Sequence, residues 1–246
     1  PGSPASTDPV LSAAAKAVAY KWEPTGATVS LLNYARAIGQ NNIKTMDKIC
    51  KLIIAKCNDD LTLQYKILAL DTYASVHGKA SMPALIKAVA HPDYKYRNAA
   101  MRMSLALKDS EVTNKWIAAF PKAIAAAKPE IITMLGERGD ATALPLITNS
   151  LSHQDQAVRI ASAAAVVKIK GSENISSLVN YMMAFSSDAD QAAAKSALMT
   201  VTGSDNMRFF IPVLKEGTPA ARKSAIELFA WNKDDKYFSE VIPFTS

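Results

Sequence analysis

The chain has 246 residues, of which 49% are hydrophobic and 20% charged, a composition that suits a folded protein and excludes disorder of the whole chain. Its formal net charge of +6 is spread along the chain, with 10 basic and 6 acidic residues in 1–92 and 18 basic and 16 acidic residues in 93–246. There is therefore no basic tail or arm, and no run of about 18 apolar residues marks a membrane span.

Residues 1–8 read "PGSPASTD" and are small, polar and rich in proline. They predict a disordered tail or an end left by processing, followed by a single helical-repeat domain over residues 9–246. The sequence has no initiating methionine and no signal peptide, so it leaves the cellular compartment open.

From residue 9 onward, apolar residues recur three and four apart and strand patterns are nearly absent, which predicts an all-α fold. We expect about seven pairs of helices, each with a helix A and a helix B, and an unpaired last helix that begins near Asp235. The pairs are expected at 9–21/26–39, 42–56/60–77, 81–90/93–107, 109–119/123–136, 141–152/155–170, 174–186/190–202 and 206–215/218–231.

Cys50 and Cys57 fall in one of these predicted helices. Seven residues of helix separate them by about 10.5 Å along the axis, which is too far for a disulfide. Because cysteine is among the most often buried residues, we expect both to be reduced core residues.

An internal repeat supports the helix pairs. The segment "MPALIKAVAHPD" (82–93) aligns without a gap with "LPLITNSLSHQD" (144–155), which superimposes a proline, a histidine and an aspartate. Segments that begin at Asp155, Asp190 and Thr218 share a further pattern, and Asp60 extends it upstream of Asp93. These matches indicate a period of about 28 to 35 residues, which accommodates two short helices and two turns.

The junctions between helices carry capping residues. We expect a polar side chain to accept hydrogen bonds from the first turn of four B helices, at Asp93, Asp155, Asp190 and Thr218. In "LGERGDATALPLI" (135–147), Gly136 is expected to end a helix B and Asp140 to cap the next helix A. Pro145 is expected either to bend that helix A or to remove a donor near its start.

The segment "LGERGDATALPLITNSLSHQDQAVRIASAAAVV" (135–167) resembles a HEAT repeat, in particular the short bacterial form akin to the phycobilisome-lyase repeat. The resemblance covers 81–231, thins over 26–80 and stops before that. It implies a right-handed, armadillo-like α-α superhelix with the B helices on the concave side. It also places a basic residue four positions after three of the caps, at Arg97, Arg159 and Arg222, whereas Asp190 is followed there by Ala194.

No pattern in the chain indicates a catalytic, cofactor or metal site. His91/Asp93 and His153/Asp155 lie two repeats apart, roughly 20 Å in a stack of helices, and cannot share one ion. His77 precedes Gly78 at a helix end, where a donor suits the exposed carbonyls. The repeated arginines could grip phosphate, but their equivalence favours a structural ladder between the caps of neighbouring repeats.

The tryptophans raise a nucleic-acid alternative, because one HEAT-like family consists of basic DNA glycosylases that use tryptophans, an arginine and a catalytic aspartate. The segment "NKWIAAFPKA" offers Trp116 but has Phe120, and no aspartate, one helical turn later. Trp116 and Trp231 are therefore expected to be core or partner-contact aromatics, with Trp231 sealing a repeat interface.

Together these features predict a non-catalytic scaffold that binds a protein partner or an attached domain along its concave face, without a cofactor or metal. The alternatives are a nucleic-acid-binding protein related to DNA glycosylases and a tetrapyrrole lyase or chaperone. The apolar last segment "KYFSEVIPFTS" predicts that the natural protein continues past Ser246. A general likeness to the helical-repeat part of exported bacterial proteins favours export over a cytoplasmic location.

Overall fold

A computed structural model describes residues 20–22, 26–233 and 235–244. The chain divides between Val112 and Thr113 into two compact units. Within the described ranges both units are built from α-helices and short 3-10 turns, and no β-strand occurs. None of the helices in these ranges is long and apolar enough to cross a membrane.

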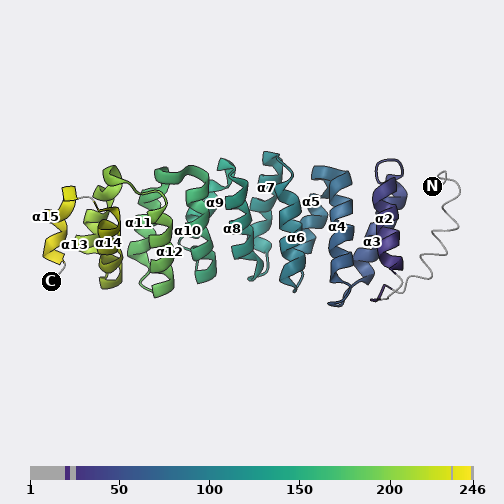
Figure 1. Ribbon diagram of the computed structural model, residues 1–246, viewed down its shortest axis with the longest axis horizontal. Coiled ribbons are helices and arrows are strands. Elements are labelled where there is room, and N and C mark those ends of the chain that lie inside the picture. The colour runs from purple at the N-terminus through teal and green to yellow at the C-terminus, as the bar shows by residue number, and fades with distance from the viewer. Residues whose placement is uncertain (1–19, 23–25, 234, 245–246) are drawn as a thin grey trace. The chain divides into compact units, whose positions relative to one another are not determined.

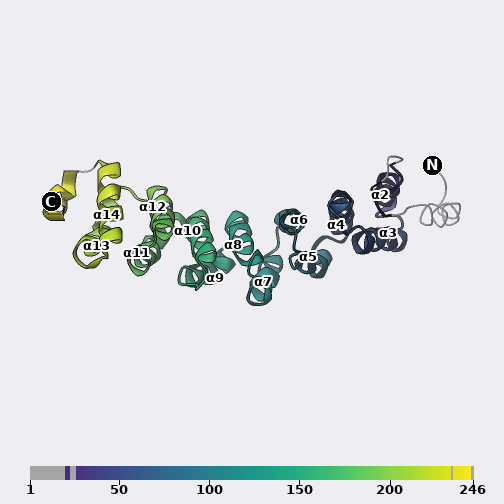
Figure 2. The same cartoon turned by 90° about the horizontal axis from the view of Figure 1, so that it is seen from below.

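The first unit is a stack of antiparallel helices. In Figure 2 its helices form two rows, with α2, α4 and α6 in one row and α3 and α5 in the other. The bounds are α2 (Ala27–Ile38), α3 (Ile43–Lys56), α4 (Leu63–His77), α5 (Met82–Ala88) and α6 (Tyr94–Leu105). The helix α7 (Ser110–Ala119) begins in this unit and ends in the second.

The second unit continues the same alternation of helix A and helix B, with α8, α10, α12 and α14 side by side as its B helices (Figure 1). It contains α8 (Ala127–Arg138), α9 (Leu144–Ser150), α10 (Gln156–Lys170), α11 (Ile175–Ala184), α12 (Asp188–Met199), α13 (Ile211–Glu216), α14 (Pro219–Asn232) and α15 (Phe238–Val241). Each unit has the consecutive helix packing of an all-α, HEAT-like solenoid.

The helices agree with the predicted pairs from residue 26 onward, and the helix predicted at 9–21 lies outside the described residues. Two of the aligned positions are wrong, because α4 is preceded by Thr62 rather than Asp60, and α12 by Ser187 rather than Asp190. With this correction, the residues that precede α4, α6, α10, α12 and α14 lie 31, 62, 32 and 31 residues apart in turn. The repeat is therefore more regular than the sequence alignment suggested.

Proline marks the start of three A helices. Pro83, Pro145 and Pro212 stand in the first turn of α5, α9 and α13, where the missing N–H has no intrahelical acceptor to lose. Of the two roles predicted for Pro145, the structure shows this second one. A 3-10 turn precedes each of these helices, which is why they begin later than predicted.

The core of the first unit follows from the apolar stripe of α3. Met46, Ile49, Cys50 and Ile53 recur at helical spacing and are buried against α2 and α4. Asn42 begins the helix by accepting a hydrogen bond from the Thr45 N–H at 3.1 Å. Both cysteines are free and buried as predicted, and burial raises the pKa of the Cys50 thiol to about 12.

Two glycines, Gly136 and Gly139, determine how α8 packs on α10 and where α8 ends. The helix runs through Gly136 and ends at Gly139, which adopts the left-handed conformation at φ 67°, so the prediction that Gly136 ends the helix is wrong. Gly136 instead allows close contact with α10. A Cβ at this position would lie 2.6 Å from Ala165 Cβ and 2.8 Å from Ala165 Cα.

We predict that Gly136→Ala destabilises the protein by about 1–3 kcal/mol, because the added methyl group forces α8 and α10 apart. Denaturant unfolding followed by circular dichroism measures the change. Gly203→Ala is the matched control, since a Cβ there has no atom within 4 Å. Equal stabilities of the two variants would contradict the close contact between α8 and α10.

Candidate functional site

The predicted capping residues Asp93, Asp155 and Thr218 stand at the N-termini of α6, α10 and α14. Asp93 Oδ1 accepts from the Lys95 N–H at 2.7 Å, and Asp155 Oδ1 accepts from the Ala157 N–H at 2.9 Å. Thr218 Oγ1 accepts from the Ala221 N–H at 3.2 Å. Each side chain therefore satisfies one backbone donor of the exposed first turn.

Asp190 does not occupy the cap that the sequence pattern predicts. Ser187 is the N-cap of α12, and Ser187 Oγ accepts from the Asp190 N–H at 3.2 Å. Asp190 is the third residue of the helix and is 1% exposed. The triplet Asp-Gln-Ala begins at both 155 and 190, but the second copy is shifted three residues along its helix, and this shift misled the alignment.

The corrected register identifies a shared position four residues after each N-cap residue. Arg97 Nη1 donates to the carbonyls of His91 and Pro92, and Arg159 Nη1 donates to those of His153 and Gln154. These bonds fasten the turn between helix A and helix B inside one repeat. In α4, α6, α10, α12 and α14 this position is occupied by Lys66, Arg97, Arg159, Gln191 and Arg222, whereas α2 and α8 have Ser30 and Glu130 there.

Gln191 and Arg222 also bond to the turn that precedes their helix. Gln191 Nε2 donates to the carbonyls of Met182 and Phe185, each at 2.6 Å. Arg222 Nη2 donates to the Lys215 carbonyl at 3.3 Å. The role of this position as a structural ladder between repeats stays a prediction, but these bonds are local to each repeat.

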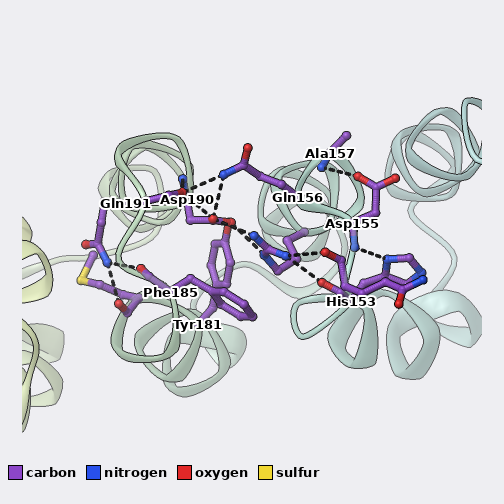
Figure 3. Close-up of polar contacts among 12 residues, drawn as sticks. His153, Asp155, Gln156, Ala157, Tyr181, Phe185, Asp190 and Gln191 are labelled. Carbon is purple, nitrogen blue, oxygen red and sulfur yellow. Dashed lines mark hydrogen bonds and ion pairs between the residues drawn. The ribbon is translucent and has the colours of Figure 1, made fainter.

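Arg159 makes a second set of contacts, which cross to the next repeat and end at Asp190, a residue labelled in Figure 3. Its Nε donates to Asp190 Oδ1 at 2.9 Å and its Nη2 donates to Asp190 Oδ2 at 2.8 Å. The guanidinium also lies over the Phe185 ring, 4.0 Å from the centroid. This bidentate ion pair is almost completely buried and joins α10 to α12.

Three further donors converge on the same carboxylate. Tyr181 Oη donates to Asp190 Oδ1 at 2.6 Å, and Ser187 Oγ and Gln156 Nε2 donate to Asp190 Oδ2 at 2.6 and 3.0 Å. Asp190 therefore accepts five hydrogen bonds, which compensate for the loss of its water shell. The site resembles a buried structural ion pair, since every lone pair that a ligand could use is already engaged.

Electrostatics follow from these contacts. Burial by itself would raise the pKa of Asp190, but the hydrogen bonds, led by that from Arg159, hold it well below its ordinary value. The Asp190 carboxylate in turn raises the pKa of Arg159. Burial is the main reason that the pKa of Tyr181 is raised, so its hydroxyl remains a donor at neutral pH.

The two His-x-Asp pairs have the same local geometry. The Asp93 N–H lies 3.1 Å from His91 Nδ1, and the Asp155 N–H lies 3.0 Å from His153 Nδ1. In each pair the ring nitrogen accepts a backbone hydrogen bond, and a ring nitrogen used in this way is not free to ligate a metal. In the described ranges, no three His, Cys, Asp or Glu side chains are grouped as a metal site would require.

The remaining predicted side chains lie elsewhere. His77 is the last residue of α4, and its Nε2 is 2.6 Å from Asp47 Oδ1 on α3. Trp116 is fully buried, so its ring is not available to stack on a base. Trp231 is 44% exposed at the end of α14 and Trp22 is 57% exposed.

The repeated helix pairs and the local contacts that fasten their turns define an all-α helical-repeat protein. Residues 113–199 match the family model described as HEAT repeats. The match covers most of α7 and all of α8 to α12, and it contains the Arg159–Asp190 ion pair. No curated protein is significantly similar to the chain.

We predict that Asp190→Asn lowers the free energy of unfolding by about 3–5 kcal/mol, because it leaves the buried Arg159 guanidinium without its counter-charge. Asp188→Asn, an exposed change two residues earlier, is the matched control and is expected to cost about 0.5 kcal/mol or less. Urea denaturation of both variants gives the comparison. Similar values for the two would show that the buried pair contributes nothing specific.

Acid should weaken the same contact. The pKa of Asp190 is lower in the folded chain than the value of about 3.9 expected when it is unfolded, so its stabilisation is present above about pH 4 and is lost as the pH falls further. We predict that the stability of the wild type falls more steeply than that of Asp190→Asn between about pH 5 and 3. Parallel pH profiles would contradict the low pKa.

Proposed function

We propose that this chain is a non-catalytic helical-repeat scaffold that binds a protein partner, or an attached domain, along the exposed face of its B helices. HEAT repeats are helical-repeat scaffolds of a kind that typically mediates protein interaction, and the match over residues 113–199 supports this class. The resemblance to the family would make the B-helix face concave. Stacked repeats present such a face as an extended and rigid surface.

The exposed side chains of α10 and α12 are the observation that carries the proposal. Between the buried positions of the two helices, small side chains alternate with a few polar ones, and the small exposed residues are Ala157, Ala164, Ala189, Ala192 and Ser196. Alanine loses no side-chain entropy when it is buried. A partner helix can therefore approach these backbones closely at little ordering cost.

The adjoining face of α14 offers an anchor for such a partner. Glu227 and Trp231 lie four residues apart and share one face of α14, and Glu227 forms an ion pair with Lys195 on α12. The Trp231 ring is 44% exposed, and tryptophan is enriched among the residues that dominate binding energy at interfaces. Small alanines beside an aromatic and a charged pair suit an amphipathic helical partner.

We predict that a photo-crosslinking amino acid placed at Ala164 or Ser196 captures the same partner in the cells that produce the protein. The same label at Ser176 or Asn180, which are exposed on the A helix α11, is the matched control and should capture it less. Equal capture from both faces, or capture only from α11, would overturn the B-helix assignment.

Whole-repeat truncation tests the scaffold character. Once the partner is identified, removal of α13 and α14, and then of α11 and α12 as well, should weaken its binding in steps, because each repeat contributes its own part of an extended surface. Surface plasmon resonance on the truncated proteins measures the loss, with circular dichroism to verify helix content. A chemical activity that disappears completely with the first truncation would argue for an enzyme instead.

A further inference from the structure

A cavity of about 610 Å³ opens in the first unit among α3, α4, α5 and α6. Figure 1 shows these four helices as successive neighbours along the chain. The cavity volume is within the range of sites that bind small organic molecules. Its lining residues are Lys51, Ile54, Ala55, Asn58, Lys66, Leu70, Tyr73, Ala84, Lys87, Ala88, Ala90, His91, Pro92 and Tyr96.

All the ionisable side chains of this lining other than the tyrosines are basic. Three lysines and a histidine face a cavity that no aspartate or glutamate lines, and the other walls are mainly aliphatic and aromatic. Lys51 already has a partner, because its Nζ lies 3.1 Å from Asp47 Oδ2. Lys87 is exposed and, within the described ranges, forms no ion pair. The cavity therefore presents positive charge to its contents.

Lys66 is the decisive residue. It is only 7% exposed, and its Nζ donates one hydrogen bond, at 2.9 Å, to the neutral Asn58 Oδ1. The ammonium also lies 5.2 Å from the centroid of the Tyr96 ring. Across the part of the chain that the structure describes, no carboxylate pairs with it. An ammonium has three N–H donors, so Lys66 retains donor capacity beside the cavity.

The repeat register shows that this arrangement is particular to Lys66. The equivalent Arg97 and Arg159 use their guanidinium groups to hold backbone carbonyls of the preceding turn. Lys66 stands at the same position after Thr62, yet its bond goes to the side chain of Asn58. Its one bond to this turn is therefore made to a neutral side chain, which leaves the buried charge without a counter-charge.

Burial without a counter-charge is costly for an ammonium. It lowers the pKa of Lys66, and burial together with the nearby Lys66 lowers the pKa of His91. A bound anion would relieve both effects, because it would supply the missing negative charge beside the buried ammonium.

We propose that this cavity binds a small organic acid, with its carboxylate on Lys66 and its apolar body against Ile54, Leu70 and Tyr73. One buried ammonium matches a head group with one negative charge, and the apolar walls match a short aliphatic or aromatic body. The exposed Lys87 attracts the acid toward the opening. This site lies within the first unit and does not depend on the partner surface proposed for the second.

Titration calorimetry with octanoate and 1-octanol tests the proposal on the whole chain. Octanoate should bind about tenfold more tightly than 1-octanol, because only the acid can form a charge-assisted hydrogen bond with Lys66. Lys66→Met keeps the length of the side chain and should abolish this preference. Lys48→Met, an exposed change on α3 outside the cavity, should leave it unchanged.

A second variant keeps the test decisive if Lys66→Met fails to fold. Ala55 is exposed at the edge of the cavity, so Ala55→Trp fills the space without changing the core and should weaken octanoate binding about tenfold. Ala37→Trp, at an exposed position of α2, is its control. The proposal is overturned if octanoate does not bind the wild type, if octanol binds as tightly, or if Ala55→Trp and Ala37→Trp bind octanoate equally.

Discussion

Close approach of consecutive B helices is the constraint on which each unit depends. A helix pair of about 31 residues cannot bury its own apolar face, so it must pack against the next pair. Small side chains make that approach possible: Gly136 meets Ala165 between α8 and α10, and Ala163, Ala194 and Ala225 are fully buried in the B helices that follow. The remaining features of the fold, including its turns and polar contacts, fix how these surfaces meet.

Polar contacts between successive repeats recur, but they differ in burial. Arg36–Asp71 and Lys79–Asp109 are largely exposed ion pairs, and Thr113 Oγ1 donates to Asp140 Oδ2 at 2.7 Å in the second unit. Such exposed pairs contribute little to stability. The Arg159–Asp190 pair is different because it is buried and fully hydrogen-bonded. A change of register between α10 and α12 would therefore leave two buried charges without a partner.

Most helices could be predicted from the sequence, because the apolar periodicity and the prolines and capping residues that bound the helices are local signals. The buried cysteines followed from the same periodicity. The register of α12 could not be predicted, since Ser187 and Asp190 are both plausible caps and only the buried contact with Arg159 distinguishes them. Lys66 was missed because the sequence alignment placed Asp60, rather than Thr62, at the start of α4, which hid the repeat position that Lys66 shares with Arg97. The cavity itself depends on four helices and leaves no local pattern.

The fastened turns between helix A and helix B have a consequence for how such a chain can change its length. Arg97 and Arg159 reach back to carbonyls five and six residues earlier, so an extra residue in either turn would move those acceptors out of reach. The connection after the B helix α10 is also restrained, because Asn174 Nδ2 donates to the Val166 carbonyl at 3.1 Å, whereas the connection from Met199 to Ile211 is longer. Insertions, whether evolved or engineered as grafted loops, should therefore be tolerated better between Met199 and Ile211 than in the turns that Arg97 and Arg159 fasten.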